Sequence, residues 1–184
     1  TVINHNAENT EVSDISLYDN NVSDSGYHSS DSTYAGISAG AFNEHAQKVL
    51  AEPVNELHVE IRPDGLIYLP GAFYRKKLND AFGAGGWAIK PLQISQDDHN
   101  MYFRGGLYIA GRFVSEAIGE GRFIANNANS SKATAVESSK TDCITRLCKD
   151  LGVAYELWTP EFGRQWQAKY AVKCKCVNIA KNNS

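Results

Sequence analysis

A regular alternation of apolar and polar positions begins near Leu57. The stretch L-H-V-E-I alternates as a half-buried strand, R-P-D-G is typical of a turn, and L-I-Y-L indicates a second short strand. A helix over residues 72–82 follows, opened by Pro70-Gly71 and ended by Gly83. Its apolar face consists of Tyr74, Leu78, Ala81 and Phe82, and its exposed face carries Arg75 and Lys76, with Lys77 nearby.

Three further strands are predicted after this helix. Alternation and turn signals place them at about residues 87–94, 101–110 and 112–118. Because the turns between them are tight, we expect an antiparallel meander. Pro91 in the first of these strands argues for an edge position or a bulge, and such an edge is a natural place for a neighbouring subunit to pair.

A long helix is predicted from about Asn129 to Leu151, where Gly152 stops it. Its apolar stripe should pack on the sheet and leave a polar, partly basic face. Lys140 projects near the middle of that stripe, so its stem either reaches the rim or faces a groove. The stripe contains Val136, Cys143, Ile144, Leu147, Cys148 and Leu151, and the opposite face contains Lys132, Ser139, Asp142, Arg146 and Lys149.

These elements predict an α+β fold in which an antiparallel β-meander or hairpin packs on a long helix, in the order β-β-α-β-β-β-α. We expect a core domain over residues 42–168, beginning with a short helix at about 42–50, and a basic C-terminal tail over residues 169–184. Residues 1–41 hold isolated aromatics among Ser, Asp and Asn, which bury too little apolar surface to offset ordering. They predict a disordered acidic arm, which is also a candidate contact for a protein partner.

Charge is divided unevenly along the chain. The formal net charge of −3 combines −9 through Glu60 with +6 from Ile61 onward. A moderately basic globule beside an acidic arm suggests an anionic partner for the globule. The longest apolar runs are far short of a membrane span, so we expect a soluble protein with no membrane partner.

Motifs for catalysis or for metal binding are absent. The chain has no H-E-x-x-H, G-x-S-x-G or P-loop sequence. The glycines of G-A-G-G (83–86) follow a predicted helix and precede a strand, whereas a phosphate cradle needs a helix N-terminus after them. The four cysteines lack C-x-x-C spacing, so reduced thiols are a simpler account than a zinc site. We therefore expect no catalytic residue, no metal and no cofactor, although a nucleotide-dependent enzyme using G-A-G-G stays open as an alternative.

Cations are interleaved with aromatic residues on the regular elements. Proteins that bind single strands need this mixture, because cations track the phosphates and aromatic faces stack on bases. Some members have a plainer explanation: Asp142 and Arg146 stand four apart and suit an intrahelical ion pair, and Tyr74 and Phe103 suit the core. The candidates are Tyr74, Arg75, Lys76 and Lys77 on the first helix, Tyr102, Phe103, Arg104, Tyr108 and Arg112 on the hairpin, and Lys132, Lys140, Arg146 and Lys149 on the long helix.

Two long blocks make the sequence recognisable. The stretches L-I-Y-L-P-G-A-F-Y-R-K-K-L-N-D-A-F-G-A-G-G-W (66–87) and S-S-K-T-D-C-I-T-R-L-C-K-D-L-G-V-A-Y-E-L-W (138–158) resemble the two signatures of the mitochondrial genome maintenance proteins, and the match covers about Leu57 to Trp166. That family is related to the nuclear strand-annealing recombination mediator and to phage annealing proteins. The resemblance implies binding and annealing of single-stranded DNA without enzymatic chemistry, by an oligomeric ring or filament, in recombination, repair and maintenance of DNA in the mitochondrial nucleoid of the matrix.

The resemblance also implies a DNA-binding face. Thr145 departs from the nuclear relative, which has Lys there, so part of the phosphate grip is expected to move, for instance to Lys140. The C-terminal end departs too, since it lacks a longer basic and aromatic segment, and Lys169, Lys173 and Lys175 would have to serve instead. A scaffold that oligomerises without gripping DNA stays open. The signature helices contribute Arg75, Lys76, Lys140, Arg146 and Lys149, and charge and position extend the predicted site to Arg104, Arg112 and Lys132.

Overall fold

The computed structural model describes residues 34, 36–38, 40–123 and 131–174, so most of the predicted acidic arm and the end of the predicted basic tail lie outside it. The chain divides into two compact units. Of the described residues, the first unit comprises those up to Glu52 together with those in Gly71–Val153, and the second comprises Pro53–Pro70 and those from Ala154 onward. The division into arm, core and tail predicted from the sequence stays a prediction.

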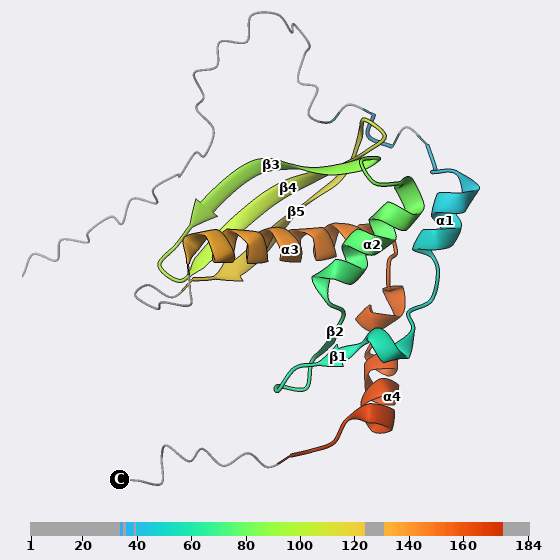
Figure 1. The fold of residues 1–184 in the computed structure, drawn as a ribbon, viewed down its shortest axis with the longest axis vertical. Helices are drawn as coiled ribbons and strands as arrows, with labels where there is room; N and C mark the ends of the chain where they lie inside the picture. The colour runs from blue at the N-terminus through green and yellow to red at the C-terminus, as the bar shows by residue number, and fades with distance from the viewer. Residues whose placement is uncertain (1–33, 35, 39, 124–130, 175–184) are drawn as a thin grey trace, which may run out of the picture. The chain divides into compact units, whose positions relative to one another are not determined.

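The first unit is built around an antiparallel sheet of β3 (Trp87–Gln96), β4 (Asn100–Ile109) and β5 (Arg112–Arg122), in that order (Figure 1). This confirms the predicted meander. The turn from β4 to β5 has positive φ at Ala110 and Gly111, the conformation of a tight two-residue hairpin turn. The register of β3 on β4 shifts between Pro91 and Gln93. Pro91 therefore lies both in an edge strand and at a bulge, as its missing N–H requires.

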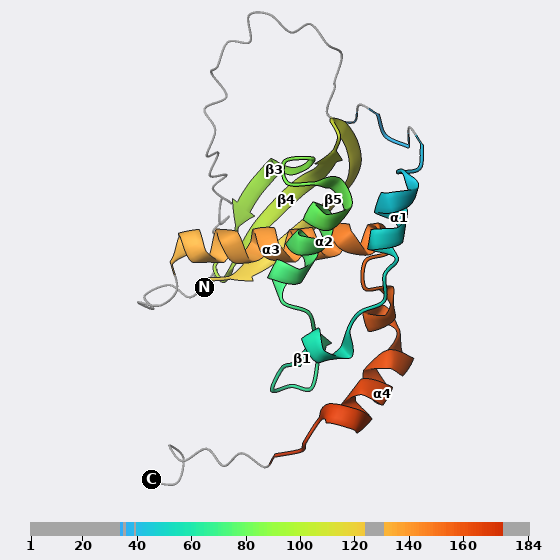
Figure 2. The same ribbon diagram turned by 45° about the vertical axis from the view of Figure 1, so that its right-hand side comes forward.

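Helix α3 (Lys132–Asp150) packs across β4 and β5 (Figure 2). The hydroxyl of Ser131 caps it by accepting the Thr134 N–H. The predicted α+β fold, a sheet packed on a long helix, is confirmed. One detail was wrong: Ser139, predicted on the polar face, is 0 % exposed. It fits there because Gly119 and Gly121 of β5 have no side chains, and its hydroxyl donates back to the Val136 carbonyl within the helix.

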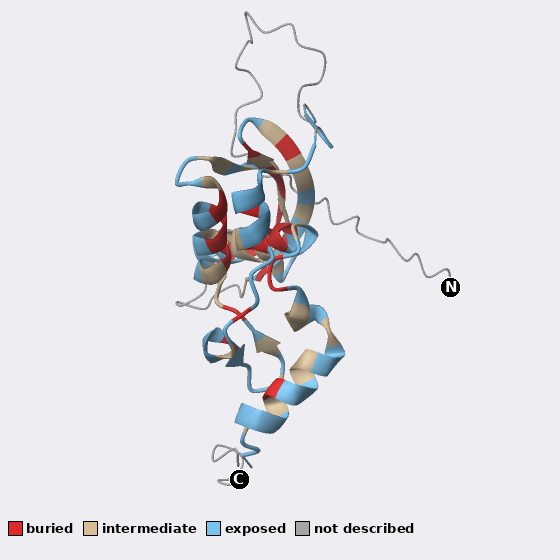
Figure 3. Cartoon of the chain, turned by 90° about the vertical axis from the view of Figure 1, so that its right-hand side faces the viewer, coloured by how far each residue is buried: buried red, intermediate tan, exposed pale blue. Residues whose placement is uncertain are grey.

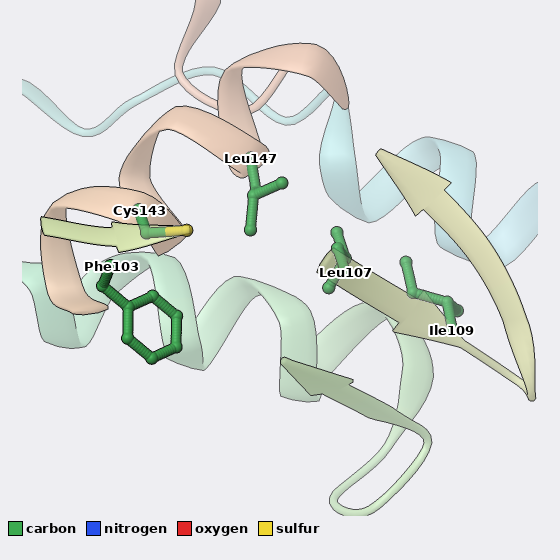
Figure 4. Packing of buried hydrophobic residues seen from close by; sticks show 5 residues of the cluster. All are labelled: Phe103, Leu107, Ile109, Cys143 and Leu147. Carbon is green, nitrogen blue, oxygen red and sulfur yellow. The ribbon is translucent and has the colours of Figure 1, made fainter. Parts of the chain in front are cut away.

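The core of this unit lies between α3 and the sheet. Phe103, Leu107 and Ile109 of β4 meet Cys143 and Leu147 of α3 (Figure 4). Buried residues gather on the inner sides of the helices and strands, and exposed residues on their outer sides (Figure 3). Alternation along β4 produces this arrangement, because every second side chain of a strand points to the same face.

Two further helices complete the first unit, α1 (Glu44–Leu50) and α2 (Gly71–Phe82). Both were predicted, and Tyr74, Leu78 and Ala81 are buried on α2 as expected. Lys77 differs from its predicted place near the exposed face, since it is only 6 % exposed. Its ammonium group pairs with Glu52 and donates to the carbonyl of Val49 (3.3 Å), so it fastens α2 to the end of α1 instead of facing a ligand.

The second unit contains two short strands, β1 (Glu60–Ile61) and β2 (Ile67–Tyr68), the single-turn helices η2 (Glu56–His58) and η3 (Tyr155–Trp158), and helix α4 (Pro160–Tyr170). The predicted strand at L-H-V-E-I is shorter than expected, because its first residues form η2. The sequence did not predict α4, whose indole Trp166 Nε1 donates to the Glu56 carbonyl (3.0 Å). No helix in the described ranges is long and apolar enough to cross a membrane.

Candidate nucleic-acid interface

A pocket of about 680 Å³ brings together three of the eight predicted DNA-binding cations. Arg104 comes from β4, and Arg146 and Lys149 come from α3. Arg104 is distant in the sequence from the other two, and the fold brings all three to the lining of one pocket. The other lining residues are Gln93 of β3, Glu116, Ala117 and Ile118 of β5, and Asp150 at the end of α3.

Arg146 is held by a carboxylate on its own helix. Its Nε lies 2.8 Å from Oδ2 of Asp142, which confirms the intrahelical ion pair expected from their spacing. The same Oδ2 accepts the backbone N–H of Glu120 at 3.0 Å. The carboxylate of Asp142 therefore connects the arginine to β5 as well as to α3.

Arg104 is paired across the sheet. Its Nη2 lies 2.6 Å from Oε1 of Glu116 on β5, and this hydrogen bond raises the pKa of the guanidinium above its usual value. The hydroxyl of Tyr34 lies 3.5 Å from the other oxygen of Glu116, and its ring packs edge-on against Phe113. Arg104 is thus a fixed positive charge with one carboxylate partner in the pocket.

Lys149 experiences a different environment. Burial lowers the pKa of its ammonium group, and the neighbouring positive charge of Arg146 lowers it further. A negatively charged ligand would reverse both effects, because it would replace lost hydration and offset the repulsion between the two cations. Three cationic side chains and the carboxylates of Glu116 and Asp150 line the pocket together. This composition suits an anionic oxygen ligand such as a phosphate group.

Two of the predicted site residues have packing roles. Arg75 donates from Nη2 to the hydroxyl of Thr141 at 3.1 Å, which joins α2 to α3. Arg112 donates to the carbonyl of Gly40 at 2.8 Å and places its guanidinium 4.1 Å from the centre of the Phe42 ring. Neither of them lines the pocket.

The remaining three also lie outside the pocket. Lys76 is exposed and pairs with Asp80 at 2.5 Å. Lys132 begins α3, with its ammonium group 5.9 Å from the centre of the Phe123 ring. The ammonium of Lys140 lies 3.8 Å from Glu137 with the side chain 38 % exposed, so its stem reaches the rim of the helix face. DNA contact by these residues stays a prediction.

Sequence reasoning missed the uncharged and acidic lining of the pocket. Gln93 pairs with Arg104 in the β3–β4 register, and Arg104 pairs with Ile118 in the β4–β5 register, so the three lie in one row across the sheet. Alternation then places Glu116, two residues before Ile118, on the same face. The sequence carried this signal, but reading it requires the register of both strand pairs.

The glycine-rich turn G-A-G-G connects the end of α2 to the start of β3. Gly83 and Gly85 have positive φ, and the N–H of Gly86 donates to the Gly83 carbonyl, so the segment is a helix C-cap and a tight turn. Within the described ranges, no group of three or more His, Cys, Asp or Glu side chains is placed to hold a metal ion.

Comparison with known proteins gives one consistent result. The family model described as mitochondrial genome maintenance MGM101 matches residues 29–184. A mitochondrial genome maintenance protein mgm101 homolog of Dictyostelium discoideum is 41% identical over 176 residues, which cover 95% of this chain and 45% of that protein. The MGM101 proteins of Mycosarcoma maydis (43% identical, 77% of this chain, 42% of that protein) and Candida albicans (42% identical, 75% and 50%) are similar as well. The chain spans about half the length of these curated relatives.

Proposed function

This chain belongs to the mitochondrial genome maintenance MGM101 family, and from that premise we propose that it binds single-stranded DNA and anneals complementary strands in the recombination, repair and maintenance of mitochondrial DNA. The observation that supports DNA binding is the convergence of Arg104, Arg146 and Lys149 on one pocket. Two of them lie on the second signature block and one on the hairpin between the blocks.

Electrostatics is sufficient for the proposed activity. Lys and Arg side chains that contact phosphates release condensed counterions, and this provides most of the affinity for nucleic acid of any sequence. Two single strands repel each other through their phosphates, and cations on the protein reduce that repulsion. Base pairing then drives annealing, so the protein makes and breaks no covalent bond. The proposed function therefore requires no catalytic residue, no metal and no nucleotide.

Assembly of several subunits would extend the contact with the DNA backbone along a strand. One pocket of this size contacts only a short stretch of backbone, whereas a ring or filament repeats the pocket at each subunit. The edge strand β3 supports this part of the proposal, because one side of it has no neighbour in the described sheet. We place the whole protein in the nucleoid of the mitochondrial matrix, since the relatives are named for mitochondrial genome maintenance.

The predicted residues outside the pocket divide into two groups. Lys76, Lys132 and Lys140 are proposed as further phosphate contacts. Arg75 and Arg112 also hold parts of the fold together, so their substitution is expected to lower stability together with affinity.

The test measures binding of a fluorescent single-stranded oligonucleotide, and annealing with its complement, as salt rises and with no nucleotide or metal added. Arg104→Gln, Arg146→Gln and Lys149→Gln each remove one positive charge from the pocket. Lys48→Gln removes one from the exposed surface of α1 and is the matched control. We expect each pocket variant to bind about three- to tenfold more weakly. Its slope of log affinity against log salt should fall by about 0.7, the value for one phosphate contact on a single strand.

Three other outcomes would contradict parts of the proposal. If the pocket variants bind as Lys48→Gln does, the interface lies on another surface. If the unaltered protein binds no single strand at low salt, the scaffold alternative replaces this proposal. If annealing depends on added nucleotide or metal, the enzyme alternative does.

A further inference from the structure

The carboxylate of Asp142 bridges strand β5 and Arg146, one of the residues that line the pocket. One oxygen, Oδ2, accepts both the backbone N–H of Glu120 on β5 (3.0 Å) and the Nε of Arg146 on α3 (2.8 Å). A backbone donor in a sheet moves very little. The hydrogen bond from Glu120 thus anchors the carboxylate to the sheet, in addition to its contact with Arg146.

The packing next to this contact fixes it further. A Cβ on Gly119 would lie 2.3 Å from the backbone nitrogen of Cys143, and the thiol of Cys143 lies 3.2 Å from the carbonyl of Ala117. A Cβ on Gly121 would likewise lie 2.8 Å from the backbone nitrogen of Ser139, so helix and strand are in close backbone contact on both sides of Glu120 and Asp142. The Asp142 side chain, which is 35% exposed, lies at the edge of this contact and is held there by the Glu120 N–H.

Glu116 provides a contrast within the same pocket. Its oxygens accept from Arg104 (2.6 Å) and from the hydroxyl of Tyr34 (3.5 Å), which are both side chains. Among the described residues, no backbone N–H donates to it. A phosphate can take the place of Glu116 on Arg104 by a side-chain rotation, whereas Asp142 keeps its bond to β5 when a ligand arrives.

We propose that Asp142 is a positioning residue that aims Arg146 into the pocket and that affects DNA binding only through Arg146. This rests on the proposed DNA-binding function and goes beyond it. The guanidinium is a planar fork, so fixing its Nε on Asp142 determines the direction of the two terminal nitrogens, which then engage phosphate oxygens. The side-chain entropy of the arginine is lost on folding and need not be lost on binding.

A positioning role predicts a change in DNA affinity opposite to the change expected from charge alone. Asp142 is a negative charge near a phosphate site, so simple electrostatics predicts that Asp142→Asn strengthens binding. A positioning role predicts that it weakens binding, because Arg146 loses its charged acceptor. The amide oxygen that Asp142→Asn introduces can still accept the Glu120 N–H, so we expect this variant to fold.

The experiment compares Asp142→Asn with Asp98→Asn by fluorescence anisotropy of a labelled single strand. Asp98 lies exposed in the turn between β3 and β4 and does not line the pocket, so its substitution gives the same change in net charge. We expect about a threefold loss of affinity for Asp142→Asn, and no loss for Asp98→Asn. In a double-mutant cycle with Arg146→Gln, the loss caused by Asp142→Asn should disappear.

Each outcome is decisive. The proposal is overturned if Asp142→Asn binds DNA as tightly as Asp98→Asn or more tightly. It is also overturned if Asp142→Asn lowers the affinity for DNA equally with Arg146 present and with Arg146→Gln. If Asp142→Asn does not fold, Asp142→Glu takes its place: it keeps the charge, so a loss that depends on Arg146 supports positioning and unchanged affinity contradicts it. If the proposed DNA-binding function itself were wrong, the unaltered protein would not bind the labelled single strand, which distinguishes this case from a failure of the positioning role.

Discussion

The carbonyl oxygen of Ser139 on α3 lies so close to Gly119 on β5 that a Cβ on that glycine would stand 2.0 Å from it. The contact repeats one turn earlier on the helix, where a Cβ on Gly121 would stand 2.1 Å from the carbonyl oxygen of Ala135. Helix and strand thus meet backbone to backbone. Arg146 and Lys149 of this helix line the same pocket as Arg104 of β4.

Gly119→Ala is expected to destabilise the first unit strongly. The added methyl group would contact backbone atoms on a packed helix, which cannot move aside as a flexible side chain can. We expect a loss of about 3 kcal/mol in the free energy of unfolding, at the upper end of the range for overpacking. Chemical denaturation followed by far-ultraviolet circular dichroism measures it.

Gly163→Ala is the matched control for that substitution. Gly163 lies within α4, and a Cβ there would be 3.8 Å from Ile67, an ordinary contact. Because alanine favours helix, this variant should be unchanged or more stable by about 0.5–1 kcal/mol. Equal stability of the two variants would show that α3 and β5 are not in backbone contact.

Glu116→Gln should strengthen binding of single-stranded DNA. The substitution removes the carboxylate that pairs with Arg104 and leaves the pocket more positive. We expect affinity at low salt to rise about threefold, and the gain to shrink as salt screens the pocket. Anisotropy titrations at several salt concentrations measure this, with Asp98→Asn as the charge control. A loss of affinity would mean that Glu116 orients Arg104 and does not compete with phosphate.

Lys149 should make binding sensitive to alkaline pH. Its pKa is lowered by burial and by Arg146, and a bound phosphate would raise it again. At a pH between the pKa of Lys149 in the free protein and its pKa in the complex, DNA binding is accompanied by uptake of a proton. Affinity for DNA therefore falls as the pH rises through this range. The fall begins below the ordinary lysine pKa of about 10.4. Lys149→Arg keeps its charge over this range. Affinities measured from about pH 8 to about pH 10 should therefore fall less for this variant. Identical pH profiles would rule out a role for the lysine charge.

The cysteines of α3 should be unreactive in the folded protein. Burial raises the pKa of Cys143 to about 11 and that of Cys148 to about 12, so both remain thiols at neutral pH. In a Cys174→Ser/Cys176→Ser variant, which removes the exposed Cys174 and its neighbour in the sequence, we expect an aromatic disulfide reagent to label the protein only after unfolding in denaturant. Rapid labelling without denaturant would show that α3 opens away from the sheet.

Local sequence patterns were enough to predict most elements of the first unit. Alternation defined β3 to β5, apolar spacing defined α2 and α3, and Pro91 indicated an edge position or a bulge. These features depend on neighbours within one element, which is why they can be read from the chain. Helix α4 was missed; its buried residue Trp166 donates to the carbonyl of Glu56, a contact between distant parts of the sequence.

Tertiary structure decided which of the predicted residues belong together. The sequence by itself determined the family, the fold class and a set of eight cations on regular elements. It could not show that Arg104, Arg146 and Lys149 share a pocket while Arg75 and Arg112 hold other parts of the fold. Helical projection placed Ser139 on the polar face, although the residue is buried. A projection contains no information about the glycines of β5 that make room for this residue. The shared pocket and the burial of Ser139 have the same physical reason. Strand register and the close approach of a helix to glycines both depend on contacts between residues that are distant in the sequence. Only the folded chain brings those residues together.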